Sequence, residues 1–145
     1  MADFDITSTN ATGVLVVDQL FPAGIELEMF GTDQSVVQDS VQVAETRMSV
    51  DGKMMAGYLP AIFPVTITLE APSRTAKSFG TLYSAMATNK TIYECSLTFT
   101  VPSVGKIYTW SKGVLHDGVP FPSNKKVLDP TTWVFHFERL DIASF

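Results

Sequence analysis

The chain has 145 residues, of which 46% are hydrophobic and 17% are charged, and its formal net charge is −5. This length fits one domain with a sizeable core, so we expect a single domain over residues 1–145. A charged share below the usual value of about 25% indicates surface buried against other chains, unless the surface is merely rich in Thr and Ser. With Lys125-Lys126 as the only adjacent basic pair, the acidic balance argues against gripping of nucleic-acid phosphates.

The sequence carries no secretion, membrane or disulfide signal. Residues 1–5 are acidic where a signal peptide is positive, and no stretch approaches the length of a transmembrane helix. A single cysteine, Cys95, excludes an intramolecular disulfide, and its phase with Tyr93 and Leu97 predicts a small core side chain. We therefore expect a protein made in a cytoplasm, without membrane insertion.

The N-terminal third predicts an arm followed by two strands. Residues 1–12 are polar and predict a flexible arm or a first turn. The apolar run 14–17 predicts a strand buried on both faces, and residues 21–24 predict a turn. Residues 25–30 alternate as a strand does, with one face formed by Ile25, Leu27 and Met29 and the other by Glu26 and Glu28.

Residues 41–60 predict a projecting β-hairpin. Its Asp51-Gly52 turn fits type I′, which needs positive φ at both central positions. Three of the six methionines lie near the tip, where exposed methionine is an adaptable contact for a partner surface. The alternative is that these methionines fold back onto the core. The candidate inter-subunit contact residues are Met48, Asp51, Gly52, Lys53, Met54 and Met55.

The first strand of this hairpin changes phase along its length. Val41 and Val43 share one phase, whereas Met48 and Val50 have the opposite phase. A one-residue bulge near Glu45 would reconcile the two halves, because a bulge changes which face the following side chains occupy.

A further strand and one helix follow the hairpin. Pro60 and Pro64 predict that the strand begins irregularly or lies at an edge, since proline removes a ladder donor. Ser73 predicts a helix N-cap and Asn89 a left-handed C-terminal cap. Gly80 in mid-helix indicates close packing against a sheet. The apolar stripe expected in the core is Ala76, Phe79, Tyr83 and Met86.

The C-terminal third predicts three strands. Residues 91–101 alternate cleanly, and residues 106–114 follow after a turn. His116-Asp117-Gly118 predicts a tight turn, and residues 118–130 predict an irregular surface loop. Residues 131–142 close the fold as a long strand, with Trp133, Phe135 and Phe137 on the core side and His136 and Glu138 opposite.

No motif of catalysis or cofactor binding is present. One cysteine and two scattered histidines do not supply the three or four ligands of a zinc site, and there is no phosphate loop or Gly-x-Ser-x-Gly elbow. We expect no enzyme activity and no cofactor or metal. The alternative class is a small antiparallel binding module or enzyme with a site near His116, Asp117 and the 118–130 loop.

The polar strand faces suggest a different kind of function. Three alternating strands place Thr, Ser and Glu opposite the core, with scarcely any Lys or Arg. Repeated around a ring, such a face would line a hydrophilic, negative channel. The candidate lumen-facing residues are Glu26, Glu28, Thr66, Thr68, Glu70, Glu94, Ser96 and Thr98. The fold class is mainly β, loosely α+β: an antiparallel β-sandwich or barrel-like fold with one packed α-helix.

The order of elements resembles that of tail tube proteins of long-tailed bacteriophages, a group related to the tube of type VI secretion. The resemblance covers about residues 25–142. It rests on the alternating segment 24–29, the hairpin segment 46–53, the strand 63–69, the helical segment 78–82 and the closing aromatic strand.

This resemblance implies hexameric rings stacked head to tail into a tube, with strands of neighbouring copies joined into an inner barrel and the helix outside. Genomic DNA would pass through the bore during ejection without specific binding. The implied partners are the sheath of a contractile tail, the baseplate and tail-terminator proteins. The implied location is the virion tail, after assembly in the host bacterial cytoplasm. Tube-initiating baseplate and tail-completion proteins share the fold, so a single-ring protein is the alternative.

Overall fold

The computed structural model describes residues 12–27, 35–70, 73–102, 104–121 and 128–144. The predicted mainly β architecture with one packed helix is confirmed. Helix α1 spans Arg74–Asn89. The strands of the described part are β1 (Thr12–Val17), β2 (Phe21–Glu26), β3 (Ser35–Gln38), β4 (Ala44–Met48), β5 (Met54–Tyr58), β6 (Phe63–Leu69), β7 (Cys95–Val101), β8 (Lys106–Gly118) and β9 (Thr131–Ser144). The predictions for Glu28 and Met29, for residues 1–11 of the 1–12 arm and for residues 122–127 of the 118–130 loop lie outside the described residues. Thr12 begins β1 and Gly118 ends β8, so the arm and the loop are each shorter than predicted.

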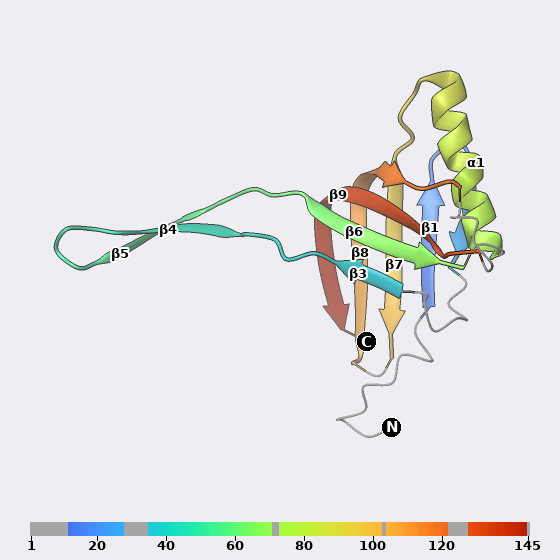
Figure 1. Cartoon of the computed structure of the whole chain (residues 1–145). Coiled ribbons are helices and arrows are strands. Elements are labelled where there is room, and N and C mark those ends of the chain that lie inside the picture. The colour runs from blue at the N-terminus through green and yellow to red at the C-terminus, as the bar shows by residue number, and fades with distance from the viewer. Residues whose placement is uncertain (1–11, 28–34, 71–72, 103, 122–127, 145) are drawn as a thin grey trace.

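Seven strands form one antiparallel sheet in the order β2-β1-β7-β8-β9-β6-β3, and β4 and β5 form a separate hairpin. The sheet does not close into a barrel, because in the described residues β2 pairs with β1 and β3 pairs with β6, not with each other. It bends over on itself instead, so that β6 and β3 cross in front of β7 and β8 (Figure 1). The indole N–H of Trp110 on β8 donates to the Gln38 side chain on β3 at 2.7 Å, across this fold.

Two layers result from the bend. Layer A consists of β2, β1, β7, residues 106–113 of β8 and residues 138–144 of β9. Layer B consists of residues 113–118 of β8, residues 131–137 of β9, β6 and β3. Strands that pass from one layer to the other at bulges or bends are the usual way of making such corners.

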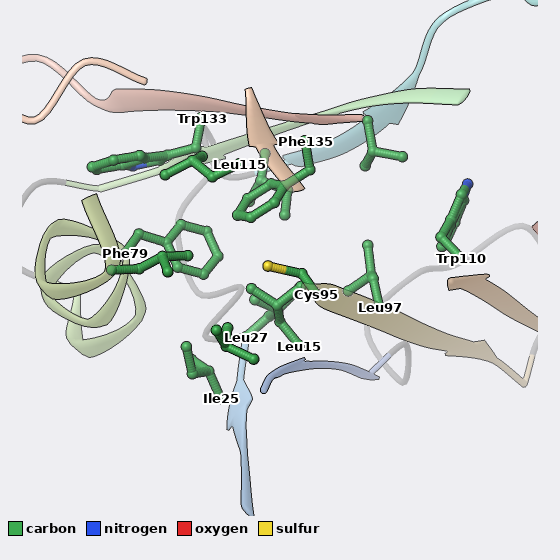
Figure 2. Close-up of a cluster of buried hydrophobic side chains, with 14 of the residues drawn as sticks. Leu15, Ile25, Leu27, Phe79, Cys95, Leu97, Trp110, Leu115, Trp133 and Phe135 are labelled. Carbon is green, nitrogen blue, oxygen red and sulfur yellow. The ribbon is translucent and has the colours of Figure 1, made fainter. Parts of the chain in front are cut away.

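The core lies between the layers. Figure 2 shows Phe135 of layer B pointing toward Leu15 and Leu97 of layer A, while Trp133 lies over α1 near Phe79, which enters from the helix side. The Phe79 ring meets Trp133 and Phe135 edge to face, with centroids 5.8 and 5.3 Å away. Such aromatic pairs add to the energy of area burial. The helix therefore closes one open side of the sandwich.

The predicted core alternation is confirmed in three strands. Its fully buried members are Val65, Ile67 and Leu69 on β6, Cys95 and Leu97 on β7, and Trp133, Phe135 and Phe137 on β9. Of the two alternatives predicted for the start of β6, an irregular beginning or an edge, the structure shows an edge on one side only. Pro64 pairs with His136 of β9 without a register shift. Its carbonyl accepts from the Asp39 N–H, so its missing donor faces the β3 side, where the ladder ends at Gln38 and Val65.

Aromatic rings lie over glycines where β8 and β9 bend. Gly113 pairs with Phe137, and Gly118 pairs with Trp133. A Cβ atom on Gly118 would lie 2.5 Å from the Trp133 ring, and one on Gly113 would overlap the Phe137 ring. The two rings therefore occupy space that only glycine leaves free, and the strands can approach closely at the corner.

Two irregularities in β8 sharpen this bend. Lys112 has a left-handed φ of 54°, at the point where the register with β7 shifts between Cys95 and Leu97. His116 is an extra residue opposite β9, since Leu115 pairs with Phe135 and Asp117 with the next residue along β9, Val134. The tight turn predicted at residues 116–118 was wrong, because the same residue types serve here as a bulge within a continuing strand.

The first strands differ from their prediction in two respects. Val14 is 38% exposed, so residues 14–17 are not buried on both faces; layer A has the core on one side only. Residues 21–24 begin β2 rather than form a turn. The reversal lies at residues 18–20, where Gln19 adopts a φ of 69°.

The helix begins as predicted and ends one residue later. The Ser73 hydroxyl accepts a hydrogen bond from the Ala76 N–H at 3.0 Å, which confirms the N-cap. The left-handed residue after the helix is Lys90, with a φ of 51°, and not Asn89. Asn89 instead completes the last turn and donates from its side chain to the Tyr93 hydroxyl.

The buried face of α1 is rotated slightly from the predicted stripe. Phe79 and Leu82 are fully buried, whereas Tyr83 is 41% exposed. The close packing expected at Gly80 was wrong, since no atom lies within 4 Å of the position of its missing Cβ.

The hairpin turn is not type I′, because only Gly52 has positive φ and Asp51 does not. Gly52 N–H donates to the Ser49 carbonyl, and Ser49 N–H donates to the Lys53 carbonyl. This is a three-residue loop in which a left-handed glycine follows an ordinary turn. The Ser49 hydroxyl also donates to the Asp51 carboxylate and holds the pKa of Asp51 below its usual value.

The bulge expected near Glu45 is absent. Every residue from Ala44 to Met48 pairs in register with β5, ending at Met48 and Met54. All residues of β4 and β5 are exposed. The change of hydrophobic phase therefore moves no side chain out of a core, and no bulge is needed to correct it.

We predict that Gly113→Ala destabilises the fold by about 1–3 kcal/mol, because the added methyl group would displace the Phe137 ring. Gly57→Ala is the matched control, since Gly57 lies on exposed β5 with nothing within 4 Å of its Cβ position. Its effect should stay within about 0.5 kcal/mol. Urea unfolding measures both variants, and a Gly113→Ala protein as stable as the wild type would refute the role of the corner.

Candidate functional site

The described residues offer no chemical centre. They contain no group of three or more His, Cys, Asp or Glu side chains placed to hold a metal ion. Burial, and then the charge of Asp18, raise the pKa of Cys95 to about 12, so its thiol is protonated at neutral pH and is no nucleophile. A membrane-crossing helix is not found in this part of the chain either. The functional surfaces must therefore be sought in the faces and edges of the sheet.

His116 and His136 lie on adjacent strands with their rings stacked face to face. The ring centroids are 3.8 Å apart and the planes differ by 12°. Burial, followed by the neighbouring His116, lowers the pKa of His136, while Asp117 opposes the shift. The bulge at His116 creates this pair, which the sequence did not indicate because the two residues are twenty positions apart.

We predict that stability falls as the pH drops below the usual His136 pKa of 6.5. Between that value and the lower folded pKa, the unfolded chain binds a proton that the folded chain does not, so acid favours unfolding. His136→Gln should flatten the change in melting temperature between about pH 7.5 and about pH 5. His116→Gln should flatten it only in part, because burial is the larger cause. Equal pH dependence in wild type and His136→Gln would contradict this.

Layer A presents a face opposite the core, and its residues form cross-strand rows. The central row is continuous through the register, because Val14 pairs with both Glu26 and Thr98, Thr98 pairs with Thr109, and Thr109 pairs with Asp141. A neighbouring row consists of Thr12, Thr100, Ile107 and Ala143. The face is thus mostly small and uncharged, with carboxylates at its two ends.

The predicted lumen residues do not all share this face. Glu26, Ser96 and Thr98 lie on it, and Glu94 is exposed just before β7. Thr66 and Thr68 lie on β6 in layer B, where they pair with Val134 and Thr132 of β9, and Glu70 follows β6. Sequence alternation groups residues by strand, but it does not say which strands share a layer.

Thr109 and Asp141 were missed as members of this face. Both alternate with core-facing neighbours on β8 and β9, so the signal was present in the sequence. Their place beside Thr98 depends on the long-range register of β8 and β9.

Both edges of layer A are unpaired in the described residues. β2 pairs only with β1, and its outer edge has no partner in the described residues. Pairing of β9 with β6 stops where Phe63 meets Phe137, so residues 138–144 of β9 have β8 on one side and no other described strand on the other. The β9 edge carries Arg139 and Asp141, whose side chains form an ion pair at 3.3 Å. Charged side chains are a common protection of unpaired edges.

The hairpin β4–β5 extends away from both layers (Figure 1). Its methionines do not fold back onto the core: Met48, Met54 and Met55 are 68%, 67% and 59% exposed. The pairing gives it two unlike faces. One carries the pairs Met48–Met54, Thr46–Ala56 and Ala44–Tyr58, and the other carries Arg47–Met55 and Glu45–Gly57. The first of these faces, here called the apolar hairpin face, is exposed to solvent and does not pack against the described part of either layer.

The fold is shared with components of contractile injection systems. A chain of the anti-feeding prophage baseplate superposes with a TM-score of 0.63 at 7% identity, covering 99% of this chain and 98% of that one. A chain of the PVC extracellular contractile injection system sheath–tube complex gives 0.60 at 9% identity, covering 99% and 95%. A chain of the anti-feeding prophage tube-terminating cap gives 0.57 at 9%, covering 100% and 95%. At these identities the likeness establishes the fold alone.

The family follows from the sequence itself. The chain belongs to the family described as tail fiber protein gp32, whose profile matches residues 4–141. No curated protein matches it. Family and fold together define a structural, tail-associated protein.

Proposed function

We propose that the chain is a tail tube subunit: copies join side by side into a hexameric ring with the polar face of layer A toward the bore, and rings stack into a tube. The observation that carries this proposal is a polar-faced layer that is open at both edges. The similarity to tube, baseplate and cap chains supports it at the level of fold.

The two open edges of layer A are suited to joining copies. Unpaired strand edges expose backbone donors and acceptors that a neighbouring chain can satisfy. β2 and β9 are different strands, so each contact is heterologous, and heterologous contacts close into rings when the rotation allows. The five strands of layer A alternate in direction. β2 and β9 therefore run the same way, and a junction between rotated copies is parallel.

The chemistry of the face suits passage of DNA rather than its capture. The central row holds two carboxylates, Glu26 and Asp141, with Val14 and two threonines between them. Arg139, on the same face, is already paired with Asp141. A bore of this kind presents few free cations to phosphates, and phosphate contacts are what makes nucleic acid stick. Genomic DNA is the proposed cargo, with sheath, baseplate and terminator proteins as partners.

A single-ring protein is the second candidate. It is favoured by the likeness to a baseplate chain and to a tube-terminating cap chain, both of which share this fold. Negative-stain electron microscopy of the purified protein separates the two. Stacks of variable length support the tube, and isolated rings support the alternative. Thin rods without a central opening, as a fibre would give, contradict both.

We predict that cysteines placed on the two edges of layer A cross-link neighbouring copies. Glu26→Cys is combined in turn with Arg139→Cys, Asp141→Cys and Ala143→Cys, and one of these pairs should yield a disulfide-linked ladder ending at the ring number. The native Cys95 is buried and does not interfere. Glu26→Cys with Thr66→Cys of layer B is the control and should stay monomeric on a non-reducing gel. Assemblies without a ladder from any edge pair would refute the edge junction.

A further inference from the structure

The apolar hairpin face lacks the cover that its composition requires. An isolated two-stranded hairpin is marginally stable in water, and this one exposes Met48, Met54 and Tyr58 along one face. Val50 at the tip is fully exposed. No other described element pairs with β4 or β5. A segment of this kind gains stability only when another surface covers its apolar face.

A groove at the root of the same hairpin has matching character. It encloses about 790 Å³ and is lined chiefly by Tyr58, Ile62, Phe63, Val114, His136 and Phe137. Ile62 is 58% exposed, so the apolar floor of this root groove is open to solvent. The volume lies within the range of about 300–1,000 Å³ found for ligand sites.

The tip of a hairpin cannot fill the groove of its own copy. β4 and β5 are paired in register through five residue pairs, from Ala44–Tyr58 to Met48–Met54. The tip is thereby held at the far end of the arm, away from the root (Figure 1). Any tip that enters a root groove therefore belongs to a second copy.

We propose that the hairpin tip of one copy docks in the root groove of another copy, with Met48 and Met54 of the apolar hairpin face against the floor of the groove. This rests on the proposed function, since it requires that copies assemble. Methionine side chains adapt to irregular apolar surfaces and make favourable contacts with aromatic rings such as Phe63. Each copy has one tip and one groove, so a copy that docks its tip in a neighbour still offers its own groove to the next copy. The contact can therefore repeat along an assembly.

The charges beside the two surfaces are complementary. Arg47 and Lys53 lie on the hairpin face opposite Met48 and Met54, and Asp51 lies in the turn at the tip. The root groove carries Glu138 and Lys112. Glu138 can form an ion pair with Arg47 or Lys53 of the tip, and Lys112 can form one with Asp51. Both charged side chains of the groove would then have a partner of opposite charge. Charge matching of this kind fixes the register of a contact more than its strength.

The test is a disulfide between tip and groove. In assembled full-length protein, Met54→Cys with Ile62→Cys should form an intermolecular disulfide on mild oxidation, seen as a ladder on a non-reducing gel and reversed by reductant. Met54→Cys with Thr81→Cys, on the exposed side of α1, is the control and should give no ladder. A disulfide formed within one chain would overturn the proposal, because it would show the tip folding back.

A second variant tests the same contact without cysteine. Met48→Thr with Met54→Thr alters only exposed side chains and adds no charge to this directly paired position, so its melting temperature as a monomer should equal that of wild type while assembly is lost. Wild-type assemblies that give no tip–groove disulfide, or an assembling double Thr variant, overturn the docking and leave the proposed function intact. Wild-type protein that never assembles overturns both.

Discussion

The architecture depends on the close approach of β8 and β9 where Phe137 lies over Gly113 and Trp133 lies over Gly118. A methyl group at either glycine would meet the ring. The two long strands can bend together because each large aromatic side chain lies opposite a residue that has no side chain. The bulges at Lys112 and His116 increase the twist at the same place. One sheet is thereby divided into two layers that enclose the core.

The same bend determines which edges stay open. β6 takes only the first half of β9, which leaves residues 138–144 at the border of layer A. β2 forms the opposite border, and neither border has a partner in the described residues. The open edges leave backbone donors and acceptors exposed to water. In the proposed function a neighbouring copy pairs with these edges, and the surface buried in that way would account for the low charged fraction.

Strand alternation was enough to predict the core but not the arrangement of layers. Val65 to Leu69, Cys95 to Leu97 and Trp133 to Phe137 alternate locally, and each strand buries the expected side. Whether Thr98 lies beside Thr109 or beside Thr66 is decided by pairing over long sequence distances, which no local pattern encodes. The bulge at His116 shows the same limit: Asp-Gly favours a turn by its local chemistry, and the β9 partner strand overrides it.

The hairpin illustrates what local chemistry does convey. The Asp51-Gly52 signal marks the reversal correctly, and the methionines near it are exposed, as the prediction of a projecting hairpin requires. The turn type and the supposed bulge were wrong for different reasons. The Asp-Gly pair fits a left-handed glycine in a three-residue loop as well as it fits type I′. The bulge was inferred from a change of hydrophobic phase, and that change has no effect where the hairpin packs against no core.

A cryo-electron microscopy reconstruction of the assembled protein tests the central claim most directly, because it shows which face of which layer meets the bore. The account predicts a ring in which Thr98 and Thr109 of layer A line the opening, and in which the β9 edge of one copy runs parallel to β2 of the next. A ring lined by Thr66 and Thr68 of layer B, or one whose copies meet without strand pairing between β9 and β2, would contradict it.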